Sequence, residues 1–163
     1  MIKRFLLILS LVFIVSFSLN AQDVKQPAVA LIPYPVTMVE GEGTFVFTEK
    51  TVVSLEDKEM EAIARDFIGL FTKAAGFTPK LKVNNKKGEV RLVKDDSLQE
   101  EGYALEVTSE KILMRAASVK GAFYALQTLR QLLPSAIESN ECKTDVVWEV
   151  PAIRVIDEPR FGY

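Results

Sequence analysis

Asp95-Asp96, Glu100-Glu101 and Asp157-Glu158 are pairs of adjacent carboxylates, which have the residue types for acid/base chemistry. Adjacent residues on an extended chain point to opposite faces, so the pair at 157–158 is not expected to act on one substrate atom. The other two pairs lie in a polar linker between predicted strands, where a solvated loop is expected, because a calcium site needs several converging oxygens. We therefore predict no catalytic, cofactor-binding or metal-binding residue in this chain.

The sequence contains no histidine and one cysteine, Cys142. The absence of histidine removes Ser-His and Cys-His nucleophile systems and the usual zinc ligand sets. Cys142 lies in a polar loop, and we interpret it as an unpaired thiol without an activating partner. One cysteine cannot close an intrachain disulfide, so the fold must be held by its apolar core.

Two further sets of side chains could contact a ligand or another domain. Trp148, Tyr103 and Tyr124 could form a platform on which sugars stack, but their apolar neighbours on predicted strands and a helix favour core packing. Gln127 and Gln131 are four residues apart on a predicted helix, away from its apolar stripe. They could form a docking surface, although a solvated helix face is the commoner case.

Residues 1–21 have the features of a cleaved secretory signal: Lys3 and Arg4, an apolar run at 5–17, and a small residue at Ala21. The apolar run is shorter than the roughly 20 residues of a membrane span. We therefore expect an exported protein, periplasmic or extracellular, that has no membrane partner once the signal is removed.

Signal removal takes away two of the 20 basic residues and none of the 22 acidic ones, so the net charge changes from −2 to about −4. A mild acidic excess without a basic stripe argues against nucleic acid as a partner.

Apolar residues at spacings of three and four predict two amphipathic helices. The first follows Ser54 and Asp57, which resemble a capping box, and ends at Gly76. The second begins after Ser118, a typical N-cap residue, and is stopped by Pro134. The apolar positions are Met60, Ile63, Phe67, Leu70, Phe71 and Ala74 in the first helix and Val119, Ala122, Phe123, Leu126, Leu129 and Leu133 in the second.

Runs of β-branched and aromatic residues predict several strands. We expect a turn at 40–43, a hairpin around the short connection at 108–110, and pairing between the two strands that flank residues 84–88, in either direction. This pattern predicts an α+β domain in which two amphipathic helices pack on one face of a β-sheet. The predicted strands are residues 44–48, 51–54, 80–83, 89–93, 103–107, 111–116, 146–148 and 153–156.

Several segments, in order, resemble the N-terminal, non-catalytic domain of bacterial family 20 glycoside hydrolases, the β-N-acetylhexosaminidases. The most specific are the run Glu-Gly-Tyr-Ala-Leu-Glu-Val at 101–107, the strand at 112–116 and the helix at 121–132. Shorter segments that agree are Leu-Ile-Pro-Tyr-Pro at 31–35, Trp148 with Val150-Pro151, and Asp-Glu-Pro-Arg-Phe at 157–161. The resemblance spans residues 28–163.

This resemblance implies that catalysis takes place in a separate (β/α)₈ barrel, for which a chain of 163 residues is too short. In the family the substrate's 2-acetamido oxygen attacks C1, while an Asp-Glu pair in the barrel orients the amide and protonates the leaving oxygen. The implied parent reaction is hydrolysis of terminal N-acetylglucosamine or N-acetylgalactosamine from glycans. The implied partner is a catalytic barrel, normally in the same chain, and this chain alone is predicted to be inactive.

We therefore divide the sequence into a signal peptide at 1–21, a polar leader at 22–28, an α+β domain at 29–151, and a connection at 152–163 into a missing barrel. Two other functions remain open at this point. The chain could be a stand-alone module that binds glycan or cell wall, or a truncated gene product without a selected function.

Overall fold

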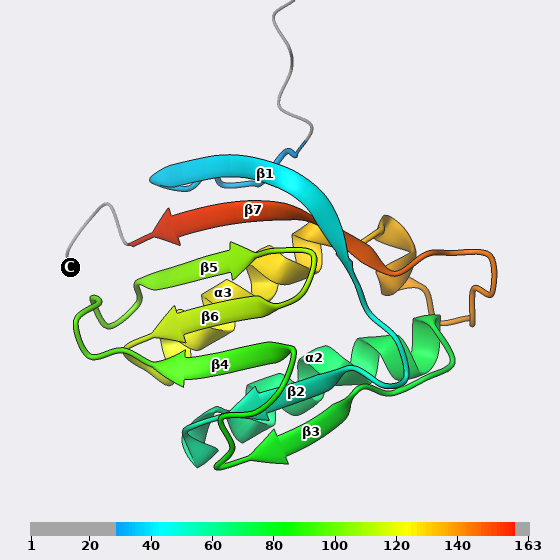
Figure 1. The fold of residues 1–163 in the computed structure, drawn as a ribbon, viewed down its shortest axis with the longest axis horizontal. Helices are drawn as coiled ribbons and strands as arrows, with labels where there is room; N and C mark the ends of the chain where they lie inside the picture. The colour runs from blue at the N-terminus through cyan, green and yellow to red at the C-terminus, as the bar shows by residue number, and fades with distance from the viewer. Residues whose placement is uncertain (1–28, 159–163) are drawn as a thin grey trace, which may run out of the picture.

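The computed structural model describes residues 29–158, which form one seven-stranded mixed β-sheet with both α-helices on the same face (Figure 1). This confirms the predicted α+β class. The predicted signal, the polar leader and residues 159–163 lie outside the described residues. The elements are β1 (Thr37–Val46), β2 (Val52–Leu55), η1 (Lys58–Met60), α2 (Glu61–Ala74), β3 (Lys80–Val83), β4 (Val90–Lys94), β5 (Tyr103–Val107), β6 (Ile112–Ala116), α3 (Val119–Leu132), η2 (Ser135–Glu138) and β7 (Glu149–Asp157).

The sheet has an antiparallel half and a parallel half, in the strand order β1-β7-β5-β6-β4-β2-β3. Strand β7 pairs antiparallel with both β1 and β5, and β5 pairs antiparallel with β6. The remaining pairs, β6 with β4, β4 with β2, and β2 with β3, are parallel. The hairpin predicted around residues 108–110 is therefore confirmed as β5 and β6.

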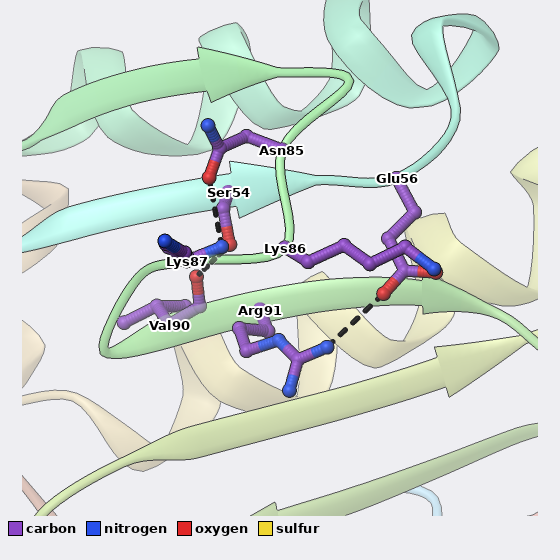
Figure 2. A network of polar contacts seen from close by, with 7 residues as sticks. All are labelled: Ser54, Glu56, Asn85, Lys86, Lys87, Val90 and Arg91. Atoms are coloured by element: carbon purple, nitrogen blue, oxygen red, sulfur yellow. Dashed lines mark hydrogen bonds and ion pairs between the residues drawn. The ribbon is translucent and has the colours of Figure 1, made fainter.

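The expected pairing between β3 and β4 is wrong, because β2 lies between them and pairs with both. The connection after β3 must cross β2 to reach the start of β4, and Figure 2 shows it passing over that strand. Gly88 permits this close crossing, since a Cβ there would lie 2.7 Å from the Val52 carbonyl oxygen. Residues 84–88 correctly predicted a break between two strands. They do not reveal that the chain crosses another strand there.

Strand β1 is longer than predicted, because residues 40–43 continue the strand instead of turning. β1 pairs with β7 on both sides of this segment, and the register shifts between Glu40 and Thr44. Gly41 packs closely on Ala152 of β7, and Gly43 adopts a φ of 91°. The two glycines thus allow a bulge-like irregularity in an edge strand rather than a chain reversal.

Strand β7 corrects two expectations about the end of the domain. Residues 146–148 are not a strand, and the predicted strand at 153–156 is part of the longer β7. The expected boundary at residue 152 falls inside β7, which lies between β1 and β5, and the side chain of Val155 is fully buried. Residues 152–157 are therefore part of the sheet and not only a connection.

The helix ends follow the sequence signals, with one exception. Ser118 caps α3 by accepting hydrogen bonds from the backbone N–H groups of residues 120 and 121, and α3 ends before Pro134, as predicted. Gly76, at φ 72°, follows the end of α2 as expected. The predicted capping box is wrong: Asp57 accepts from the backbone N–H of Glu59 and caps the short η1 helix, while Ser54 is a buried residue of β2.

The core fills the space between the sheet and the two helices. Phe71 of α2 is fully buried, with ring centroids 4.8 Å from Phe47, 5.8 Å from Phe67 and 6.1 Å from Trp148. Each buried aromatic or aliphatic side chain contributes about 1.5–3 kcal/mol relative to exposure. The prediction that Trp148 packs in the core is confirmed, at 5% exposure.

Candidate functional site

A hollow of about 400 Å³ opens where the segment before β1, the helix α3 and the end of β7 meet. These three segments are distant in sequence, and the sheet order brings them together by placing β7 beside β5, under α3. Most of the wall is apolar, from prolines, tyrosines and a leucine, and carboxylates lie around it. The lining residues are Leu31, Pro33, Tyr34, Pro35, Glu101, Tyr103, Tyr124, Gln127, Thr128, Gln131, Asp157 and Glu158.

The side chain of Gln131 holds the segment before β1 against α3. Its Oε1 accepts a hydrogen bond from the Ile32 backbone N–H at 3.0 Å, and its Nε2 donates to the Ile32 carbonyl oxygen at 3.2 Å. This two-point contact imitates one rung of a β-ladder. Leu31 precedes Ile32 in the chain and is buried at 5% exposure, so the segment is fixed by both polar and apolar contacts.

The end of β7 forms the opposite wall and is also tied to other segments. Asp157 Oδ1 accepts from the Val36 backbone N–H at 3.1 Å, and Glu158 Oε2 accepts from Gln99 Nε2 at 3.0 Å. The carboxylate pair therefore connects the end of the sheet to the segment before β1 and to the loop before β5. The two side chains have separate partners, as expected for adjacent residues on an extended chain.

The floor of the hollow contains a buried hydroxyl pair. The hydroxyls of Tyr103 and Thr128 lie 2.6 Å apart, and both side chains are buried. Burial raises the pKa of the Tyr103 hydroxyl above its usual value of 10.0; the hydrogen bond to Thr128 opposes this, and the negative charge of Asp157 adds to it. Tyr103 is therefore a neutral packing residue at physiological pH, and its predicted core position is confirmed.

One sequence-based interpretation of this region is wrong, and one is incomplete. Gln131 is exposed, as a solvated helix face predicts, but its amide also binds the backbone of Ile32. Tyr124 is not a core residue: it is 43% exposed on the outer face of α3, beside the ring of Phe123 at a centroid distance of 5.8 Å. The helical period placed Gln127 and Gln131 correctly off the buried stripe, but it contains no information about the segment that binds Gln131.

A second, smaller depression of about 160 Å³ lies between the two helices and shares Gln127 with the hollow. Its walls come from α2 and α3. Arg130 on its rim pairs with Glu138 of η2, an ion pair that raises the pKa of Arg130 and lowers that of Glu138. The lining residues are Ile63, Asp66, Phe67, Leu70, Phe123, Leu126, Gln127 and Arg130.

The other acidic pairs lie near the start of α3, in surface contacts. Asp95 accepts hydrogen bonds from the backbone and hydroxyl of Ser97, which lower its pKa, and it pairs with Arg115 at 3.0 Å. Glu100 and Glu101 both pair with Lys120, at 3.1 and 3.5 Å. A hollow of about 270 Å³ lies in this region, but its lining mixes acidic and basic side chains without a common charge.

A polar network on β2 and β4 is structural in character (Figure 2). The carboxylate of Glu56 forms ion pairs with Arg91 at 3.0 Å and with Lys86 at 3.9 Å. These ion pairs connect the end of β2 to β4 and to the segment that crosses β2. Asn85 Oδ1 accepts from the Lys87 backbone N–H at 2.7 Å, which closes the turn. These contacts hold the crossing of β2 in place.

The described residues 29–158 offer few groups for catalysis. Among them, no three His, Cys, Asp or Glu side chains are grouped as metal ligands would be. In the same range, no helix is long and apolar enough to cross a membrane. Cys142 is exposed, close to Gly76, and forms no disulfide. The walls of the hollow on α3 are mainly apolar, and the amide of Gln131 and the hydroxyl of Tyr103 in its lining are bonded within the domain.

The model of glycosyl hydrolase family 20, domain 2 matches residues 28–158, which is the whole of the described fold. The chain belongs to this family of non-catalytic hexosaminidase domains. The match covers β7 to its end, in agreement with the position of that strand inside the sheet.

Two relatives that match this chain in sequence are named as hexosaminidases. The chain is 29% identical to a β-hexosaminidase of Porphyromonas gingivalis over 161 residues, 94% of this chain and 21% of the relative. It is also 29% identical to a β-N-acetylhexosaminidase of Cellulomonas fimi, over 84% of this chain and 27% of the relative.

Solved structures of hexosaminidases contain a similar fold over part of their length. An N-acetyl-β-hexosaminidase of Streptomyces plicatus is similar at a TM-score of 0.74 and 26% identity, over 80% of this chain and 26% of that one. A β-N-acetylhexosaminidase of Bacteroides fragilis is similar at a TM-score of 0.59 and 25% identity, over 80% of this chain and 25% of that one. The chain thus spans about a fifth to a quarter of the length of these relatives, which carry their catalytic barrel in the same chain.

Proposed function

We propose that this chain acts as the non-catalytic accessory domain of an exported β-N-acetylhexosaminidase. The observation that supports this most strongly is the family match over residues 28–158, together with relatives that bear this enzyme name. The parent reaction would be removal of terminal N-acetylglucosamine or N-acetylgalactosamine from glycans. The domain would supply no acid/base pair for that reaction, because Asp157 and Glu158 have separate partners within the domain.

Export is part of the proposal and is supported by residues 1–21, which have the charged start, apolar run and small terminal residue of a secretory signal. Cleavage at Ala21 would leave the polar leader ahead of the domain. Expression with its own signal, followed by N-terminal sequencing of the exported product, tests this part: a product that begins near Gln22 supports it, and retention of Met1 contradicts it.

A graft tests the enzymatic part of the proposal. The segment of the Porphyromonas gingivalis enzyme that this chain matches would be replaced by residues 28–158, and hydrolysis of a chromogenic N-acetylglucosaminide would be measured. The control is the same enzyme with that segment deleted. We expect the graft to be active and the deletion to lose activity or solubility. A soluble graft with no more activity than the deletion would contradict the proposal.

A stand-alone glycan-binding module is the main alternative, because Tyr34 and Tyr124 both line the hollow. Aromatic rings are common sugar-stacking surfaces. However, sugar hydroxyls also need polar partners, and the amide of Gln131 and the hydroxyl of Tyr103 are already bonded within the domain. The accessory role therefore fits the hollow better.

A further inference from the structure

We propose that the face of the sheet away from the helices carries a binding site for an anionic polysaccharide, at the point where residues 84–88 cross β2. The choice of a polysaccharide among polyanions rests on the proposed function, whereas the charge of the site does not. The site is named below the crossing patch and is defined by four lysines and one arginine: Lys80, Lys82, Lys86, Lys87 and Arg91.

The segment that contains the crossing patch differs in charge from the rest of the domain. Residues 80–91 include five basic residues and one acidic residue, Glu89. The other described residues include eleven basic and twenty acidic ones. The acidic balance of the whole chain therefore conceals a basic patch, to which a polyanion is attracted while the rest of the surface repels it.

Alternation along the strands directs the strand residues of the patch to one face of the sheet. Lys80 and Lys82 of β3 are exposed, whereas Leu81 and Val83 are partly buried against the core. In the same way, Arg91 lies between two buried residues of β4. The core lies on the side of the helices, so the patch is on the side that the helices leave uncovered (Figure 1).

Ser54 of β2 lies at the centre of the crossing patch. It is paired with Lys82 of β3 on one side and with Arg91 of β4 on the other. Neighbouring strands are about 4.8 Å apart, so the Cα atoms of Lys82 and Arg91 are about 10 Å apart. Gly88 lies over Ser54, since a Cβ on Gly88 would be 3.0 Å from the Ser54 hydroxyl oxygen. The crossing thus holds Lys87, the residue before Gly88, above β2 (Figure 2).

Most of the positive charge of the crossing patch is not neutralised within the domain. Glu56 pairs with Arg91 at 3.0 Å and with Lys86 at 3.9 Å. The other three lysines of the patch are exposed and form no ion pair with a described residue. The carboxylate of Glu89 accepts a hydrogen bond from the Val52 backbone N–H at 2.9 Å. Three ammonium groups are therefore available to an anionic ligand.

The residue types of the patch indicate which kind of polyanion it suits. Neither residues 80–91 nor β2 contains an aromatic side chain. Aromatic rings are the usual stacking surfaces for neutral sugars and for unpaired nucleic-acid bases, so this patch would bind mainly through sulfate or carboxylate groups. The exposed amide of Asn84 offers donors and an acceptor for hydroxyl groups. A glycan with acidic groups supplies both, and glycans are the substrates of the proposed parent enzyme.

Protection of the sheet edge explains only part of the patch. Lysines on an edge strand discourage pairing with other chains. This accounts for Lys80 and Lys82, because β3 is the last strand of the sheet. It does not account for Lys86 and Lys87, which lie on the crossing segment and not on the edge strand. These two lysines add charge to the same face without protecting an edge.

Binding of chondroitin sulfate to the purified chain, measured by isothermal titration calorimetry at low salt, tests the proposal. This polymer of N-acetylgalactosamine and glucuronic acid carries both sulfate and carboxylate groups. A soluble chitin oligosaccharide is the neutral control, and polyglutamate and duplex DNA are the controls for other polyanions. We expect chondroitin sulfate to bind more tightly than all three, and added salt should weaken its binding, because salt screens a contact between exposed charges.

Two double variants locate the binding site. Lys82→Gln with Lys87→Gln removes two unpaired charges from the crossing patch. The matched control is Lys58→Gln with Lys73→Gln, which changes the net charge equally at exposed positions on η1 and α2. Both double variants should melt within about 1–2 °C of the wild type, since exposed substitutions usually have small effects. The patch variant should bind chondroitin sulfate at least about tenfold more weakly, and the control variant should bind within about twofold of the wild type.

Three results would overturn the polysaccharide proposal. The wild-type chain could fail to bind chondroitin sulfate, or the two double variants could weaken its binding equally. Polyglutamate or duplex DNA could also bind as tightly as chondroitin sulfate, which would assign the patch to an acidic protein or to nucleic acid. Failure of the proposed function is distinct, because it appears as an inactive graft whether or not the chain binds the polymer.

Discussion

The contact between Gln131 and the backbone of Ile32 yields a quantitative prediction. Gln131→Ala removes two hydrogen bonds, of 3.0 and 3.2 Å. A net intramolecular hydrogen bond contributes about 0.5–1.5 kcal/mol, and both partners remain accessible to water once the side chain is removed. We therefore expect the free energy of unfolding to fall by about 1–2 kcal/mol. Burial of Leu31 should keep the loss from becoming larger.

Urea unfolding measured by tryptophan fluorescence is the appropriate assay, because Trp148 is the single tryptophan and lies in the core. Gln127→Ala is the matched control: the same substitution one helical turn earlier, on the same face, should change the free energy by less than about 0.5 kcal/mol. Gln131→Glu should be at least as destabilising as Gln131→Ala, since it places a carboxylate oxygen near the Ile32 carbonyl. Equal midpoints for Gln131→Ala and Gln127→Ala would show that the contact between Gln131 and the Ile32 backbone does not stabilise the fold.

Three further predictions concern the core and its packing. Leu126→Ala, at 2% exposure on α3, should lower the free energy of unfolding by about 2–5 kcal/mol, and a wild-type urea midpoint would show that the helix face is misassigned. Gly121→Ala should lower the melting temperature, because the added Cβ would collide with the backbone carbonyl oxygen of Gly102. Gly69→Ala on α2 should raise the melting temperature, because no atom lies within 4 Å of the added Cβ and alanine favours a helix over glycine. The opposite order of the two melting temperatures would contradict the helix packing. Burial raises the pKa of Tyr103, so its contribution to the free energy of unfolding is complete below pH 10 and is lost as the pH rises through the pKa of the folded state. Urea titrations from pH 8 to 11 should therefore show a smaller fall in the free energy of unfolding for Tyr103→Phe than for the wild type. An equal fall in both proteins would count against burial of the hydroxyl.

Local patterns predicted the local structure well. The three-and-four spacing found both helices, Ser118 marked the start of α3, and the short polar connection marked the β5–β6 hairpin. These features depend on residues close together in sequence. The pairing of β3 and β4 with β2 was missed, because strand order depends on contacts between distant segments, and the same turn residues fit a hairpin or a crossing.

The candidate site was predicted less well, for the same reason. Gln131 contacts a residue 99 positions away, and helical periodicity shows only that its side chain leaves the buried stripe. Tyr124 resembles a core residue by type, and its exposure follows from its angular position on α3 relative to Ala125 and Leu126, which are buried. A stricter helical count would have separated Tyr124 from the core. No pattern in the sequence indicates that Asp157 would bind the Val36 backbone.

The proposed function makes this domain a part of a β-N-acetylhexosaminidase. An antibody raised against the folded domain, used on extracts and culture medium of the source cells, tests it directly. We expect it to capture a polypeptide four to five times the length of this 18.2 kDa chain, in line with the coverage of the relatives, and the captured material should hydrolyse a fluorogenic N-acetylglucosaminide. Capture of an 18 kDa product alone, without hydrolytic activity, would contradict the proposed function.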